Sequence, residues 1–237
     1  MTPARPGEAA GPRLRVVTYN IKGGRGPGLA GVVRELEPDV LVVQEGPRRF
    51  RWRARCAELA RTFGIYYAAG GLPALGNVIF VGMRVRPRET WCVRYPLTPG
   101  RHMRGAAYAR CEVDGTEFLV AGTHLATDGA ERPAQAALFG AELTRGGVPA
   151  VVCADLNETA EGESFRLVAA GRLDAAVVAG GEAAATPTYS TARPRRRIDV
   201  VLVDPPHVVE SYRVVDTPAA RAASDHFPVV ADLRLPA

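Results

Sequence analysis

Long apolar runs, paired cysteines and lysine are almost missing from this sequence of 237 residues. No run approaches the roughly 18 to 20 apolar residues that span a bilayer, so we expect no integral membrane association. The N-terminus lacks the apolar core of a secretory signal. Residues 1–13, rich in proline, alanine and glycine, are expected to form a flexible tail, and residues 14–237 a single domain.

The cysteine pattern argues against a zinc cluster or a redox motif, because no C-x-x-C pair occurs. The four cysteines are far apart: Cys56, Cys92, Cys111 and Cys153. They are expected to be free thiols in a reducing cytoplasm. The sequence also lacks a G-x-S-x-G elbow, a Walker loop and an H-E-x-x-H helix, so those enzyme classes have no support.

The net charge of +5 is unevenly distributed. Residues 1–111 carry 19 basic and 7 acidic side chains, whereas residues 112–237 carry 11 basic and 18 acidic ones. The basic half suggests an anionic partner. The acidic half could supply metal ligands or could be ordinary surface. Of the 30 basic residues only Lys22 is a lysine, so arginine is the default cation of this chain.

Many strands with few helices between them predict two packed sheets with helices outside, which is an α/β fold. The patterns predict strands at 14–20, 39–45, 75–82, 89–95, 107–113, 117–123, 149–154, 198–203, 208–214 and 228–235. They predict helices ending near residue 36 and at 50–62, 131–144 and 161–170. Asp114-Gly115 is expected to form a hairpin turn, because this pair tolerates positive φ.

Polar side chains recur where predicted strands end. They are Asn20, Glu45, His124, Asp155, Asn157 and Asp199, together with Asp225 and His226 just before the last strand. Strand ends meet at the rim of a sheet, so distant segments can converge there. Carboxylates, amides and imidazoles together suit Mg²⁺ beside a phosphate, and they suit activation of water. Taken singly, each residue is more often a cap, a turn residue or a satisfied buried histidine.

With these polar residues in this order, the sequence resembles the endonuclease/exonuclease/phosphatase superfamily, the deoxyribonuclease I-like phosphoesterases. The matching motifs run through nearly the whole chain: T-Y-N (18–20), Q-E (44–45), G-N (76–77), R-G (104–105), T-H-L (123–125), A-D-L-N (154–157), R-I-D (197–199) and S-D-H-F-P-V (224–229). The resemblance implies a four-layer α/β/β/α sandwich of two mostly antiparallel sheets. It also implies that residues 14–237 form one catalytic domain for metal-dependent phosphate ester hydrolysis.

The resemblance implies roles residue by residue. Glu45 would be the principal ligand of Mg²⁺ or Mn²⁺, with Asn20 and Asp225 at or near the metal. Asp155 would orient or deprotonate the attacking water, while Asn157 and His124 hold the scissile phosphate. His226 would be general base or phosphate ligand, with Asp199 fixing its tautomer. The choice of proton acceptor between Asp155 and His226 stays open. Arg104 and Lys22 are further candidates for phosphate contact.

Two departures from the family pattern stand out. Ala154 replaces the usual glycine of G-D-x-N. Lys22 stands where some members carry an acid, which argues against a second acidic metal site in that loop.

Two basic stretches have alternative interpretations. The stretch at 48–55 either tracks a nucleic-acid backbone or, as we favour here, forms an amphipathic helix with Phe50 inward. The arginines of 193–197 either meet a polyanion or merely flank a strand.

The sequence is also compatible with rival hypotheses. Gly26-x-Gly28-x-x-Gly31 mimics a dinucleotide-binding fingerprint, but five residues separate Gly26 from Asn20 at the strand's end. The protein could instead bind anions or nucleic acid without catalysis. Within the family, the substrate could be a nucleic acid or another phosphodiester, a phosphoinositide, sphingomyelin or a small phosphomonoester. A nuclease or small phosphodiesterase is favoured because no long inserted loop is evident. No protein partner is predicted.

Overall fold

The computed structural model describes residues 11–237. Residues 1–10, on which most of the expected tail falls, lie outside the described residues, and the first strand begins at Arg13. The strands are β1 (Arg13–Asn20), β2 (Val40–Gln44), β3 (Tyr66–Gly70), β4 (Val78–Val81), β5 (Arg86–Arg94), β6 (Gly105–Val113), β7 (Thr116–His124), β8 (Ala150–Asp155), β9 (Leu173–Asp174), β10 (Asp199–Val203), β11 (Val208–Val214) and β12 (Val229–Arg234).

The helices lie between and outside these strands. They are α1 (Leu29–Leu36), α2 (Trp52–Phe63), α3 (Arg132–Leu143), α4 (Glu163–Ala169), α5 (Ala175–Ala179) and α6 (Pro218–Ala223), with short 3₁₀ turns η1 (Lys22–Gly24), η2 (Thr144–Gly146) and η3 (Ala183–Ala185). None of the helices within residues 11–237 is long and apolar enough to cross a membrane.

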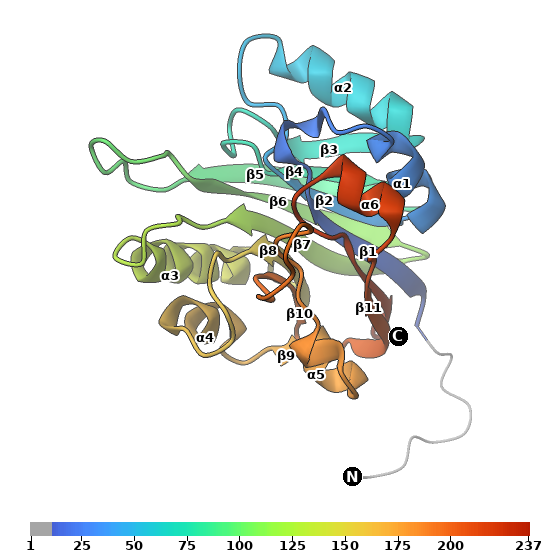
Figure 1. Cartoon of the computed structure of the whole chain (residues 1–237). Coiled ribbons are helices and arrows are strands. Elements are labelled where there is room, and N and C mark those ends of the chain that lie inside the picture. Colours follow the sequence, from blue (N-terminus) through green and yellow to red (C-terminus); the bar gives the residue numbers. More distant parts are fainter. Residues whose placement is uncertain (1–10) are drawn as a thin grey trace.

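The strands form two six-stranded sheets that pack face to face (Figure 1). The first has the order β11-β12-β1-β2-β4-β3, and the second has the order β5-β6-β7-β8-β10-β9. Each sheet contains one parallel pair, β1–β2 in the first and β7–β8 in the second, and its other pairs are antiparallel. The expected sandwich of mostly antiparallel sheets is confirmed.

Alternation along the strands fills three apolar layers. In β1, Val16 faces the core between the sheets, while Val17 faces the outer core under α1, α2 and α6. A third core lies between the second sheet and helices α3 and α4. The two sheets pack tightly where β7 faces β2, because a Cβ on Gly122 would lie 2.4 Å from a methyl of Val42.

Strand register brings the polar strand ends to one edge. Asn20 pairs with Gln44 across β1 and β2, which places Glu45 just beyond that pair. His124 pairs with Asp155 across β7 and β8. On its other side, Asp155 is paired with Asp199 of β10. The carboxyl ends of both parallel pairs therefore meet in one place, although their residues are far apart in sequence.

Most of the expected elements occur close to their predicted ranges. Asp114 and Gly115 have φ values of 48° and 85°, so the hairpin turn between β6 and β7 is confirmed. The predicted strand at 75–82 begins only at Val78, because residues 75 and 76 turn with positive φ. The sequence patterns missed β3, β9, α5 and α6. These elements are short, and β3 is a partly exposed edge strand without regular alternation.

Candidate active site

Asp155 lies at the centre of the converging residues and is buried. Its Oδ2 accepts a hydrogen bond of 3.0 Å from Asn20 Nδ2, and its Oδ1 accepts one of 3.0 Å from the backbone N–H of Asn157. Burial raises the pKa of Asp155, but the neighbouring imidazoles of His124 and His226 and these hydrogen bonds outweigh it. The resulting pKa lies below its ordinary value, so the carboxyl group is ionised.

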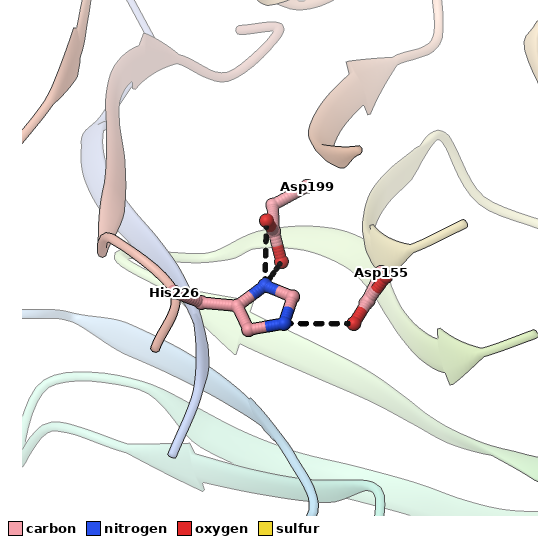
Figure 2. Close-up of side chains that lie close together, drawn as sticks. All are labelled: Asp155, Asp199 and His226. Atoms are coloured by element: carbon pink, nitrogen blue, oxygen red, sulfur yellow. Dashed lines mark hydrogen bonds and ion pairs between the residues drawn. The ribbon is translucent and has the colours of Figure 1, made fainter. Parts of the chain in front are cut away.

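His226 stands between two carboxylates (Figure 2). Its Nδ1 lies 2.9 Å from Asp199 Oδ2, and its Nε2 lies 3.7 Å from Asp155 Oδ2. Burial lowers the pKa of His226, but the charge of Asp199 and the hydrogen bond to it prevail and raise the pKa to about 9. At neutral pH the ring is therefore an imidazolium that holds its second N–H toward Asp155.

Arg104 and His124 form a second buried pair. Arg104 Nη1 donates across 3.0 Å to His124 Nδ1. Burial lowers the pKa of His124 to about 3, so the ring is neutral. His124 Nε2 lies 3.3 Å from Asp155 Oδ2 and 2.9 Å from Asn157 Nδ2. Arg104 and Asn157 thereby hold the orientation of the His124 ring.

The charge of Arg104 has no counterion close by. Its side chain is buried, its Nε lacks a hydrogen-bond partner, and no carboxylate of residues 11–237 lies within ion-pair distance. Burial lowers its pKa, which reflects the cost of holding this cation away from water. A buried guanidinium in this state can bind an anion such as a phosphoryl oxygen.

Glu45 and Asn20 complete the oxygen-rich side of the site. Asn20 Nδ2 lies 3.5 Å from Glu45 Oε1, so one amide group spans the carboxylates of Glu45 and Asp155. Asp155, Asp199 and His226 also offer ligand atoms within 4.8 Å of one another. Hard oxygen donors of this kind fit Mg²⁺ or Mn²⁺, and the site can hold a divalent ion.

Three candidate residues have left-handed backbone conformations. The φ values are 47° for Lys22, 55° for Glu45 and 51° for Asn157. Such conformations cost free energy in residues other than glycine, and they persist where the surrounding structure holds them. Asn157 is held by its side-chain amide, which donates to the carbonyl of Leu125 across 3.0 Å and lies 2.9 Å from His124 Nε2.

Lys22 and Asp225 lie at the outer edge of this group. Lys22 Nζ is 3.0 Å from Asp225 Oδ2, and the backbone N–H of Lys22 donates to Asn20 Oδ1 across 3.1 Å. All ten residues singled out in the sequence are therefore joined by hydrogen bonds, ion pairs or chain adjacency. They are Asn20, Lys22, Glu45, Arg104, His124, Asp155, Asn157, Asp199, Asp225 and His226.

Several supporting residues were not singled out in the sequence. The Ser224 hydroxyl donates to the Asn20 carbonyl across 2.6 Å and tethers the two segments. The Thr188 hydroxyl accepts from the backbone N–H of Asp199, and the Tyr189 ring lies 4.7 Å from the ring of His226, centre to centre. Ser224 could have been found as part of the S-D-H motif, whereas Tyr189 lies in a loop with no periodic signal.

The basic stretch at 48–55, which runs into α2, differs from expectation in the position of its aromatic side chains. The prediction that Phe50 points inward was wrong, because Phe50 is 86% exposed and Trp52 is buried instead. The helix begins at Trp52, so Phe50 precedes it and does not follow its periodicity. In the arginine run at 193–197, Arg197 pairs with Asp174 at 2.7 Å, and Arg196 packs over the ring of Tyr189.

The glycine fingerprint has a different structural explanation. A Cβ on Gly26 would lie 1.7 Å from the carbonyl oxygen of Ala223, so glycine allows this loop to approach α6 closely. Gly28 precedes α1 with a φ of 73°. Two mixed sheets also differ from the doubly wound parallel sheet that binds dinucleotides, and this argues against a dinucleotide-binding oxidoreductase, the enzyme class that the glycine fingerprint would indicate.

Two packed mixed sheets with this set of acids, amides and imidazoles at one edge define a deoxyribonuclease I-like phosphoesterase. Residues 17–226 match the model of the Endonuclease/Exonuclease/phosphatase family, and the chain belongs to that family of metal-dependent phosphoesterases. The resemblance noted in the sequence and the enzyme class that it implied are confirmed. Among curated proteins, no sequence matches this chain.

Solved structures of the same fold cover nearly all of this chain. An endonuclease/exonuclease/phosphatase from Beutenbergia cavernae aligns with a TM-score of 0.73 and 26% identity, over 94% of this chain and 72% of that one. A mannosyl-6-phosphatase from Bacteroides thetaiotaomicron aligns at 0.77 and 19%, over 93% and 99%. D. rerio TDP2, complexed with a single-strand DNA product, aligns at 0.74 and 19%, over 93% and 98%.

Proposed function

We propose that this protein is a phosphodiesterase that hydrolyses nucleic-acid strands by in-line attack of water on phosphorus. The observation that carries the proposal is a buried Arg104 without an ion pair, which bonds to His124 in the same site as the carboxylate of Asp155, 3.3 Å from the His124 ring. Such a site can bind an anion beside the guanidinium and a cation beside the carboxylates. A phosphate ester with a divalent ion meets both requirements.

The charge states of the site residues support distinct roles. Asp155 is ionised and accepts a proton from the attacking water. His226 carries a proton at neutral pH and donates a hydrogen bond to a phosphoryl oxygen, while Asp199 fixes its ring. Because Asp155 is unprotonated and His226 already carries its proton, we assign Asp155, rather than His226, as the general base.

Binding of the phosphate falls to the opposite side of the site. Asn157 and the neutral ring of His124 contact the phosphoryl oxygens, and Arg104 and Lys22 supply positive charge. Glu45 would be the principal ligand of Mg²⁺ or Mn²⁺, with Asn20 and Asp225 beside it. A bound ion supplies neutralisation of charge on the phosphoryl oxygens.

The exposed loop that follows Glu45 in the sequence favours a nucleic acid over a small ester. Phe50 is 86% exposed and follows Glu45 in the loop between β2 and α2, flanked by the exposed Arg49 and Arg51. An exposed ring between cations can stack on a base while the cations meet the backbone. The D. rerio relative was solved with a single-strand DNA product, which supports the same substrate class.

A panel of substrates tests this proposal. Single-stranded DNA, duplex DNA, RNA, a phosphoinositide, sphingomyelin and a sugar phosphate are offered with Mg²⁺ and with Mn²⁺. We expect a single-stranded nucleic acid to have the highest kcat/KM. Phe50→Ala should raise its KM by about tenfold, because stacking one base on an aromatic ring is worth roughly 1 to 3 kcal/mol.

The control for this panel is Met83→Ala, which removes a side chain that is 84% exposed in the turn between β4 and β5. It should leave KM unchanged. Faster turnover of the phosphoinositide or the sugar phosphate would instead identify the protein as a lipid or small-molecule phosphatase. Tight binding of every anion without turnover under either metal would favour a non-catalytic binding module.

We also propose that residues 14–237 act as one catalytic domain, because strands from both ends of this range share the first sheet. A cytoplasmic location is part of the same proposal. It is supported by the four cysteines, all of which are free thiols in the structure.

A further inference from the structure

A groove of about 480 Å³ opens beside the candidate active site, between the turn that follows β1 and helix α2. The residues that matter for its chemistry are Gly23, Gly24 and Arg25 in the turn and Arg55, Glu58 and Leu59 in the helix. The backbone N–H of Gly23 donates to the carbonyl of Glu45 across 3.0 Å. The groove therefore begins next to a residue that holds one edge of the site.

Two of the lining side chains are arginines without an ion pair. Arg25 and Arg55 are exposed, and neither lies within ion-pair distance of a carboxylate in residues 11–237. Glu58 is the one acidic residue that lines the groove, so two positive charges face one negative charge. A guanidinium with free N–H groups can bind a phosphate through paired hydrogen bonds. The groove is therefore suited to an anion.

The rest of the lining leaves room for the group that carries such an anion. Gly23 has a φ of 81°, and a Cβ there would meet no other atom within 4 Å, so the turn presents bare backbone to solvent. A Cβ on Gly24 would lie 3.7 Å from a methyl of Leu59, so the turn packs against α2 at this point. The half-buried Leu59 gives the groove an apolar part. A nucleotide combines a weakly polar sugar with an anionic phosphate, and both would find a matching surface.

We propose that this groove is a subsite for the nucleotide next to the scissile phosphate, and that Arg25 and Arg55 hold the phosphate of that nucleotide. The inference rests on the proposed function for the identity of the strand, and it adds the path that the strand takes away from Glu45. It also divides the arginines of the 48–55 stretch, because Arg55 lines the groove whereas Arg53 packs over the ring of Trp52.

The test compares a thymidine octanucleotide with thymidylyl-thymidine, which has a scissile phosphate and no second one. Arg25→Gln together with Arg55→Gln should raise the KM of the octanucleotide by about tenfold, because charged hydrogen bonds to a phosphate are lost. The preference for the octanucleotide in kcat/KM should fall by the same factor. Glu58→Gln should act in the opposite direction and lower the KM of the octanucleotide, because it removes the negative charge of the groove.

The matched control is Arg34→Gln together with Arg61→Gln. These arginines are also exposed, on α1 and α2, have no ion pair within residues 11–237 and do not line the groove, so the KM of the octanucleotide should stay unchanged.

Binding is also measured without turnover, by fluorescence anisotropy of the labelled octanucleotide in EDTA at several salt concentrations. The slope of log Kd against log salt should be smaller by about 0.7 when Arg25 and Arg55 are replaced, because one phosphate contact is lost. An unchanged slope together with an unchanged preference for the octanucleotide would overturn the inference. The predicted changes in binding, in a protein that hydrolyses no oligonucleotide, would contradict the proposed function alone.

Discussion

Asp155→Asn should lower kcat by at least about 10²-fold, with any change in KM much smaller. The substitution keeps the size of the side chain and removes the charge that accepts the proton of the attacking water. It also replaces the carboxylate that three other groups contact, which are the Asn20 amide, the backbone N–H of Asn157 and the His124 ring. Steady-state kinetics on a single-stranded oligonucleotide measure the effect.

Asp204→Asn provides the comparison. Asp204 also accepts a backbone hydrogen bond, from Ala150 at 2.7 Å, and pairs with Arg172, but it lies at the opposite end of β10 from Asp199. Its loss should reduce stability and leave kcat unchanged. If Asp155→Asn retained full turnover while remaining folded by circular dichroism, Asp155 would not be the general base.

His226→Ala should also reduce kcat by about 10²-fold, and it should change the dependence of the rate on pH. In the unaltered protein the pKa of His226 is raised to about 9. The ring is protonated below that pH and donates to the phosphoryl oxygen, so the rate should fall as pH rises through about 9. The variant lacks this group, and its lower rate should not show that decline.

His207→Ala is the matched substitution for this measurement, because His207 is equally buried but lies beyond the far end of β10. Its pH–rate profile should keep the decline near pH 9. A profile of the unaltered protein that rises through this range would show instead that His226 works as a neutral base.

The candidate site could be predicted from the sequence because several of its polar residues stand at the ends of predicted strands. Asn20, His124 and Asp155 each close an apolar run, and the two parallel pairs bring those ends to one edge of the sandwich. Each residue alone was better explained as a cap or a turn. Their order along the chain, together with the motif around His226, made the phosphoesterase class predictable.

Other features depend on conformations that a residue pattern does not encode. The left-handed backbone at Glu45 and Asn157 follows from contacts made only in the folded protein. The helical pattern predicted a start at residue 50, but the helix begins two residues later, and Phe50 lies before it with its side chain exposed. Similarly, the ion pair between Lys22 and Asp225 joins segments that are far apart in sequence.

The most direct test of a metal-dependent phosphodiesterase is to remove and restore the ion. Hydrolysis of a single-stranded oligonucleotide is followed in Mg²⁺, then with excess EDTA, then after Mg²⁺ is returned, with Asp155→Asn measured in parallel. We predict that EDTA abolishes product formation, that Mg²⁺ restores it, and that the variant stays inactive throughout. Hydrolysis that continues unchanged in EDTA would contradict the account.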